Sequence, residues 1–192
     1  MAHKFNPKNK HKLDRDERKE KMPPFETLKK LKLKEGLSML DVGAGTGYFS
    51  IPASKIVGDN NHVYASDISN DMLELIKEKI NNKNIKNIKV IKGEEYYTKL
   101  DTKVDYILLS NVFHEVEDKN KFLNNYLSYL NEEGLIAFIE WKKKNTHKGP
   151  PKKDRLNDED INNILHKYNM KIIKTVDIND THYGLVARKI KQ

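Results

Sequence analysis

The chain has 192 residues, of which 37% are hydrophobic and 33% are charged, and its formal net charge is +8 at pH 7. This length and apolar content predict one folded domain, residues 1–192, with a heavily charged surface. Because the chain has no cysteine, disulfides, thiolate metal sites, iron–sulfur clusters and a cysteine nucleophile are excluded. No stretch has the pattern of a membrane span or of a signal peptide, so we expect a cytoplasmic protein.

The positive charge is concentrated in two segments. Residues 1–34 carry a net charge of +7 and residues 142–155 a net charge of +6, while the remainder sums to −5. Such segments either are solvated tails and loops or attract phosphates and anionic surfaces. Pro23-Pro24 separates the first 22 residues from the rest, so residues 1–24 are predicted to form a basic N-terminal arm.

Apolar segments alternate between strand and helix patterns along most of the chain. The expected helices are 25–33, 47–57, 69–82, 119–130 and 157–170, and the expected strands are 38–42, 62–68, 88–93, 104–111, 134–141, 171–178 and 183–190. This alternation predicts a three-layer α/β sandwich: a mostly parallel seven-stranded sheet with helices on both faces. The last two strands, joined by a short connection, are expected to form an antiparallel hairpin at one edge.

A glycine-rich loop follows the first expected strand, in the segment "LDVGAGTGYFS" at residues 40–50. Ligands of open α/β sheets bind beyond the carboxyl ends of the strands, where glycines let the backbone approach them closely. The dinucleotide pattern G-x-G-x-x-G counted from Gly43 would need a glycine at Tyr48. Asp41 would repel a phosphate placed at this loop, but it suits a positively charged ligand. The loop therefore favours a cofactor with an amino acid and a sulfonium over a dinucleotide.

A second acidic residue, Asp67, ends the next expected strand, 20 residues after Gly47. A carboxylate at this place can accept hydrogen bonds from both hydroxyls of a ribose. The alternative is that Asp67 only caps the following helix. Taken together with the glycine loop, the ribose interpretation is favoured.

Four segments in this order resemble the class I S-adenosylmethionine-dependent methyltransferases: "LDVGAGTGYFS", "VYASDISNDML", "VIKGEEYY" and "VDYILLSNVFHEVED". The resemblance covers nearly the whole chain, and within the class it is to the ubiquinone/menaquinone-biosynthesis type. It implies a Rossmann-like fold, S-adenosyl-L-methionine as the cofactor and S-adenosyl-L-homocysteine as the product, with no metal expected. The first two motifs are specific for the cofactor, and none is specific for the methyl acceptor.

The resemblance also implies that the N-terminal arm, residues 1–24, folds over the cofactor as a lid, and it implies a role for individual residues. The backbone of the loop would approach the methionine part of the cofactor, Asp41 would hold its ammonium, and Asp67 would bind the ribose. Ile68, and less directly Met72, would pack on the adenine, and Glu94 or Glu95 would meet the adenine amine. The implied cofactor-binding residues are Asp41, Gly43, Ala44, Gly45, Gly47, Asp67, Ile68, Met72, Gly93, Glu94, Glu95, Ser110 and Asn111.

The range of possible methyl acceptors is limited mainly by motifs that the chain lacks. Amino methyltransferases of adenine or glutamine usually carry Asn/Asp-Pro-Pro-Tyr/Phe after the fourth strand, whereas this chain has "SNVFHE" there. A small molecule methylated at an oxygen, sulfur, carbon or simple nitrogen atom is the main hypothesis. His114 is the candidate catalytic base, and the alternative is that it lines the pocket and bonds a backbone group.

Two other functions remain open at this point. The basic segments 1–34 and 142–155 could clamp the phosphates of a ribosomal or transfer RNA, which would make the chain an RNA methyltransferase. The chain could also bind the cofactor without catalysis. A quinone acceptor would bring the protein to a membrane surface, where the basic N-terminal segment could make a peripheral contact. The oligomeric state does not follow from the sequence.

Overall fold

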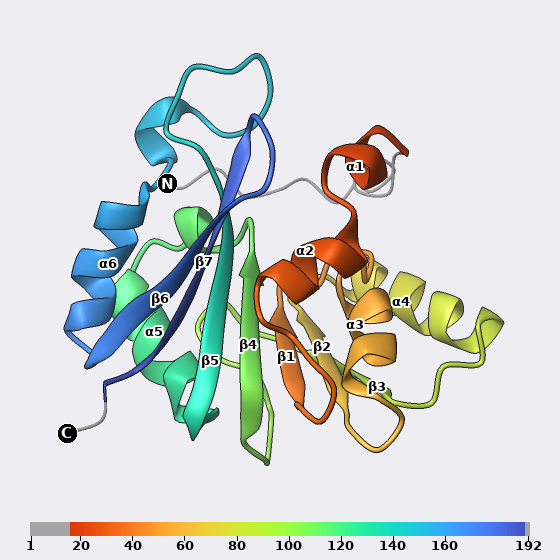
Figure 1. Cartoon of the computed structure of the whole chain (residues 1–192). Coiled ribbons are helices and arrows are strands. Elements are labelled where there is room, and N and C mark those ends of the chain that lie inside the picture. Colours follow the sequence, from red (N-terminus) through yellow and green to blue (C-terminus); the bar gives the residue numbers. More distant parts are fainter. Residues whose placement is uncertain (1–15, 191–192) are drawn as a thin grey trace.

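The computed structural model describes residues 16–190, which are organised around a single seven-stranded sheet (Figure 1). The strand order is β3-β2-β1-β4-β5-β7-β6. The strands are β1 Met39–Val42, β2 Val63–Asp67, β3 Ile88–Lys92, β4 Val104–Ser110, β5 Leu130–Trp141, β6 Met170–Asp177 and β7 His182–Lys189. The first five run parallel, and β7 pairs antiparallel with both β5 and β6. The predicted fold, including the antiparallel hairpin at one edge, is confirmed.

Helices cover both faces of the sheet (Figure 1). They are α1 Asp16–Lys21, α2 Pro24–Lys30, α3 Ser50–Val57, α4 Asn70–Asn82, α5 Lys119–Ser128 and α6 Asp158–His166, with short 3₁₀ turns η2 Phe113–Glu115 and η3 Lys152–Asp154. Side chains of a strand alternate between its faces, so β4 contributes to two cores. Tyr106 and Leu108 pack in the core under α2, α3 and α4, whereas Ile107 and Leu109 pack in the core under α5 and α6.

Several element boundaries differ from the expectation. The strand predicted at 134–141 begins four residues earlier, at Leu130, because Leu130 pairs with Val104 of β4. The polar residues that follow it form a bulge before Leu135 pairs with Tyr106, and the Asn131 side-chain amide donates to Asp105 at 2.6 Å. The helix predicted at 157–170 ends at His166, since β6 begins at Met170. Its start is as expected, with Asn157 forming a capping box with Asp160. The helix predicted at 47–57 begins only at Ser50.

The strand order determines where the chain can bind a ligand. From β1 the connections lead outward to β2 and β3 on one side, while β4 and β5 lie on the other side. The loops that follow β1 and β4 therefore diverge at the carboxyl ends of these strands, which is the switch point where open α/β sheets bind ligands. We call this end of the sheet the carboxyl edge. It is uppermost in Figure 1, where the chain after β5 and helix α1 also lie.

Candidate active site

The glycine loop, residues 43–47, leaves β1 in a backbone conformation that favours glycine. Gly43, Gly45 and Gly47 have φ angles of +69°, +56° and +78°. The amides of Gly43 and Ala44 both donate to the Ser66 carbonyl, at 2.8 and 2.9 Å. A Cβ atom on Gly43 would lie 2.5 Å from a methyl carbon of Val112. The loop is thus held between β2 and the segment that follows β4.

Asp67 connects the glycine loop to the start of α4. One carboxylate oxygen accepts the Gly45 amide at 2.8 Å, and the other accepts the Ser69 amide at 2.8 Å. Burial raises the pKa of the carboxyl group, against the opposing effect of these two amides. Asp67 therefore does support the helix start, as the capping alternative predicted. An ionised carboxylate has about four acceptor positions, so two remain for a ligand that donates.

Asp41 is buried below the glycine loop, with 2% of its surface exposed. Its side chain accepts a hydrogen bond from the Ser50 hydroxyl at 2.5 Å. Burial raises the pKa of Asp41 to about 7; the Ser50 hydrogen bond opposes this shift and the charge of Asp67 adds to it. Two carboxyl groups thus lie near one another at the loop, and a positively charged ligand would relieve their repulsion.

The end of β4 presents polar atoms without partners. Among residues 16–190, the Ser110 hydroxyl and the Asn111 side-chain oxygen are buried and make no hydrogen bond. Asn111 has a φ angle of +56°, and its amide donates to the Ile139 carbonyl at 2.8 Å. Buried polar atoms of this kind are costly unless something bonds them. Their location beside the glycine loop indicates a place where a polar ligand would be held.

The remaining residues implied by the resemblance lie around Asp67. Ile68 is 55% exposed, although it is a large apolar residue, whereas Met72 is buried. The Gly93 amide donates to the Asp67 carbonyl at 3.0 Å, which holds the end of β3 against the end of β2. Glu94 and Glu95 follow on an exposed turn. The structure thus brings the ends of three neighbouring strands together.

His114 lies in η2, just beyond β4, and it is 6% exposed. Its Nδ1 atom is 2.6 Å from a carboxylate oxygen of Glu140, a fully buried residue at the end of β5. Burial lowers the pKa of His114, but the hydrogen bond and the charge of Glu140 outweigh it, so that the pKa is raised. The sequence places Glu140 at the end of the expected strand 134–141, at the same rim as His114, but assigns it no role in the site. The signal was a single acidic residue within the apolar run "GLIAFIEW".

Part of the predicted N-terminal arm packs on the carboxyl edge. The guanidinium of Arg18, in α1, lies 4.0 Å from the centre of the Tyr48 ring, and the Tyr48 hydroxyl donates to the Met22 carbonyl at 2.7 Å. Lys148 forms an ion pair with Glu17 at 3.5 Å, which connects the two basic segments. Residues 1–15 of the arm lie outside the described residues.

The basic loop, residues 142–155, is organised by one of its own cations. Arg155 is 3% exposed, and its guanidinium donates five hydrogen bonds. Its acceptors are the carbonyls of Lys142, Lys144, Lys148 and Pro150 and the hydroxyl of Thr146, at 2.6 to 3.1 Å. The same guanidinium lies 5.2 Å from the Trp141 ring centre. Arg155 therefore holds the loop together instead of facing a partner.

Replacing Arg155 by Met should loosen the basic loop without unfolding the chain. Methionine keeps much of the volume but has no N–H donor, so four carbonyls and a hydroxyl lose their partner. We expect limited trypsin digestion to cleave the loop about tenfold faster, because local opening becomes less costly. Lys153→Met, which removes an exposed charge from the same loop, should leave the cleavage rate close to that of the parent. Equal rates for the parent and Arg155→Met would contradict this role.

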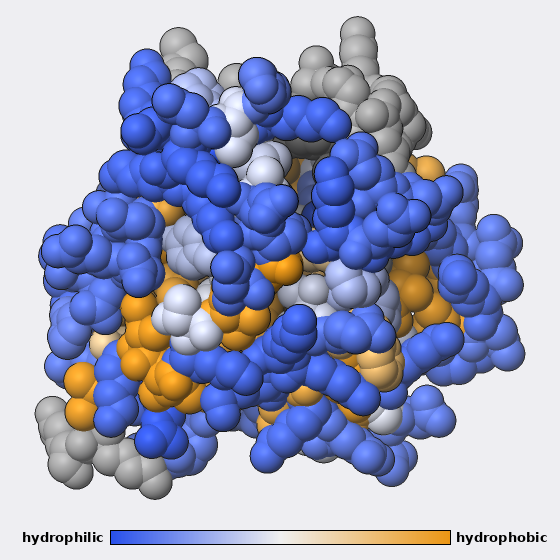
Figure 2. Space-filling view, turned by 45° about the horizontal axis from the view of Figure 1, so that its top comes forward, coloured by the Kyte–Doolittle hydropathy of each residue, from blue (hydrophilic) through white to orange (hydrophobic). Residues whose placement is uncertain are grey.

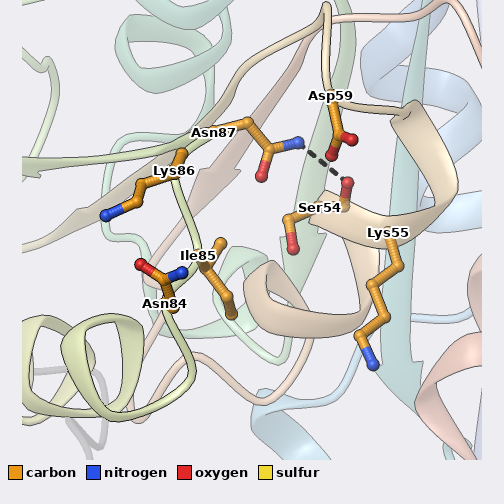
Figure 3. A pocket seen from close by; sticks show the side chains of 7 residues that line it. All are labelled: Ser54, Lys55, Asp59, Asn84, Ile85, Lys86 and Asn87. Atoms are coloured by element: carbon orange, nitrogen blue, oxygen red, sulfur yellow. Dashed lines mark hydrogen bonds between the residues drawn. The ribbon is translucent and has the colours of Figure 1, made fainter.

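Figure 2 looks obliquely onto the carboxyl edge and shows a hollow there, between two mostly hydrophilic lobes. A second depression, of about 450 Å³, lies at the opposite end of the sheet (Figure 3). Its lining residues are Ser54, Lys55, Asp59, Asn84, Ile85, Lys86 and Asn87. None of the residues predicted for the site lines it, and its Asn87 amide already donates to the Ser54 and Gly58 carbonyls. We therefore place the candidate site at the carboxyl edge.

The fold is that of the class I S-adenosylmethionine-dependent methyltransferases. A family model described as "Methyltransferase domain" matches residues 33–180, and the chain belongs to this family. A solved S-adenosylmethionine-dependent methyltransferase from Aquifex aeolicus is similar over 96% of this chain and 98% of its own, with a TM-score of 0.89 and 34% identity. The predicted family is thereby confirmed.

Curated relatives are similar over a shorter part of the chain. A ubiquinone/menaquinone biosynthesis C-methyltransferase from Haemophilus ducreyi is 31% identical over 113 residues, which is 58% of this chain and 44% of the relative. A demethylmenaquinone methyltransferase from Listeria welshimeri is 28% identical over 121 residues, 62% of this chain and 51% of the relative. The matched part thus spans about half the length of these relatives. Within residues 16–190, no helix combines the length and apolar character needed to cross a membrane.

Proposed function

We propose that the protein transfers a methyl group from S-adenosyl-L-methionine to a small-molecule acceptor. The observation that carries the proposal is the joint arrangement of Asp67 and the glycine loop. One carboxylate holds the Gly45 amide and the start of α4 and still has acceptor positions for a ribose. This arrangement lies at the switch point of the sheet in a chain of the methyltransferase family.

The cofactor fits the residues at this edge. Asp67 would accept the ribose hydroxyls, and the exposed face of Ile68 would pack on the adenine. Asp41 and the backbone of the glycine loop would face the cationic methionine part. The unpartnered oxygens of Ser110 and Asn111 would accept hydrogen bonds from its ammonium, which would account for their burial. Glu94 or Glu95 would meet the adenine amine.

When bound, the cofactor supplies the methyl group from its sulfonium, and the electron pair of the broken carbon–sulfur bond stays on the sulfur. The chain then has to align the acceptor with the methyl carbon and exclude water. His114 would take the proton of the acceptor as a general base, so that the acceptor attacks as an anion. The residues of α1 that pack on Tyr48 support the proposal that residues 1–24 act as a lid of a single domain, 1–192.

For the acceptor we propose a hydroquinone that is methylated at a ring carbon. The named activities of the Haemophilus ducreyi and Listeria welshimeri relatives support this class. A ring carbon next to a phenolate is nucleophilic, and a base at His114 would produce that phenolate. After the carbon–carbon bond forms, the methylated ring carbon loses its proton to water and the hydroxyl is restored, so that the ring is aromatic again.

Neither alternative function gains support. Three of the lysines in the basic loop already have carboxylate partners: Lys142 with Asp177, Lys143 with Asp160 and Lys148 with Glu17. Arg155 is used within the loop. Fewer charges therefore remain for a phosphate clamp than the sequence indicated. A cofactor-binding protein without activity would not need a buried imidazole–carboxylate pair next to the cofactor site.

The proposed function is tested with cofactor labelled in its methyl group. We expect label to be transferred to 1,4-dihydroxynaphthalene, kept reduced under argon, and the labelled product to carry a new carbon–carbon bond by mass spectrometry. A fractionated cell extract serves as a second source of acceptors. Label in an RNA fraction that disappears after ribonuclease treatment would refute the small-molecule proposal. Binding of cofactor without transfer to any fraction would favour the non-catalytic alternative.

A further inference from the structure

The candidate base and the buried acid next to it come from neighbouring strands. Ser110, the last residue of β4, pairs with Ile139 in β5. The chain after Ser110 turns at Asn111 and enters η2 at Phe113, while Glu140 is the next residue of β5. His114 and Glu140 therefore meet at the carboxyl edge, directly beside the unpartnered oxygens at the end of β4.

Both carboxylate oxygens of Glu140 contact His114. One oxygen is 2.6 Å from His114 Nδ1, and the other accepts the backbone amide of His114 at 3.2 Å. Glu140 is 0% exposed and His114 is 6% exposed. Because a carboxylate at this depth needs partners, this double contact determines both the position of η2 and the orientation of the imidazole ring.

The contact also determines which ring nitrogen can act. When Glu140 is ionised and His114 neutral, the proton resides on Nδ1 and Nε2 carries the lone pair. Nε2 makes no hydrogen bond to any residue in the range 16–190, and its distance to a Glu115 oxygen is 3.9 Å. The other charged or titratable groups that act on the pair within residues 16–190 are Lys119, from α5, and two residues of β7: His182, and Tyr183, which pairs with Glu140.

We propose that Glu140 is a positioning residue that keeps His114 in the Nδ1–H form, so that Nε2 is the atom that takes the proton of the acceptor. This proposal rests on the proposed function. In the step, the proton of an acceptor hydroxyl moves to Nε2, and its electron pair stays on the acceptor. Glu140 keeps its hydrogen bond to Nδ1–H and faces the imidazolium that results. A carboxylate there stabilises that cation without itself taking the proton.

The first test measures the protonation of the His114 imidazole directly and needs no methyl acceptor. Nitrogen-15 NMR of the full chain should show His114 with its proton on Nδ1 in the neutral form. In Glu140→Gln, which keeps the volume but not the charge, the pKa of His114 should fall by about 1, because the opposite charge is gone. The exposed neighbour Glu117 provides the control, and Glu117→Gln should leave the pKa and the tautomer unchanged. A proton on Nε2 in the parent would overturn the proposal.

The second test measures transfer to reduced 1,4-dihydroxynaphthalene. Glu140→Gln should lower kcat by about 10²–10³-fold, the range of a lost general base, with cofactor affinity unchanged by calorimetry. The acidic limb of the pH profile should move to lower pH, and Glu140→Asp should restore part of the rate. A purely structural role would leave the pH profile unchanged and would overturn the proposal. If the parent does not methylate the probe, the proposed acceptor class is refuted, while the NMR result still decides the role of Glu140.

Discussion

Asp67→Ala should weaken binding of S-adenosyl-L-methionine by at least about 100-fold. The expected size follows from the loss of two hydrogen bonds to a charged group, each contributing about 1.5–3 kcal/mol. Isothermal titration calorimetry measures this directly. The variant also leaves the Gly45 and Ser69 amides without their acceptor, so its thermal unfolding has to be measured alongside. Binding has to be compared at a temperature at which the variant is folded.

Asp71→Ala is the matched control for this substitution. Asp71 is an exposed carboxylate in the first turn of α4, four residues after Asp67. It has the same charge as Asp67 but does not lie at the carboxyl edge beside the glycine loop. We expect its affinity for the cofactor to equal that of the parent. Unchanged affinity in a folded Asp67→Ala variant would show that the ribose is held elsewhere.

Asp41→Asn should stabilise the protein and weaken cofactor binding at the same time. The pKa of Asp41 is about 7 in the folded protein, above its ordinary value of 3.8, so the folded state holds the proton more tightly than the unfolded chain. Stability is therefore lost as the pH rises from about 4 to about 7, and the loss is complete above that range. Because asparagine does not ionise, the variant should be more stable than the parent at pH 8, by up to about 4 kcal/mol.

The same substitution should change how binding depends on pH. Cofactor affinity of the parent should rise about tenfold between pH 6 and pH 8, because a cationic ligand prefers the ionised form of Asp41. The affinity of Asp41→Asn should be weaker and nearly flat over this range. Calorimetry at pH 6, 7 and 8 and thermal melts at the same values check both effects. The exposed Asp59 supplies the control Asp59→Asn, which should change neither. A parent affinity that does not vary with pH would refute the role of Asp41.

The fold was predictable because its signals are local. Short apolar strands alternate with amphipathic helices, and a parallel sheet buried on both faces needs that alternation. The errors were at boundaries where tertiary pairing overrides composition. The polar residues around Asn131 have the composition of a loop, yet the pairing of Leu130 with Val104 and the hydrogen bond from Asn131 to Asp105 hold them as a bulge within β5.

The place of the candidate cofactor site was predictable for a related reason. Gly43, Gly45 and Asp67 occupy strand ends whose position follows from the topology alone. The sequence does not show that Asp67 accepts hydrogen bonds from the Gly45 and Ser69 amides in addition to its proposed role with a ribose. These contacts are visible only in the tertiary structure. The same holds for Arg155. From the composition it would be a surface charge, whereas in the structure its guanidinium donates to the backbone and one hydroxyl of the basic loop.

By itself, the sequence determined the sheet, the class of enzyme and the strand ends at which a cofactor would bind. The sheet and the strand ends follow from periodicity and topology, and the class of enzyme follows from the resemblance of four segments to a known family. Only the tertiary structure decided which groups share a proton or a buried charge: His114 with Glu140, 26 positions away, and Asp41 with Ser50 under the glycine loop. Partnerships of this kind depend on distance in space and on burial, and burial is what raises the pKa of Asp41 and makes the Glu140 carboxylate need its partner.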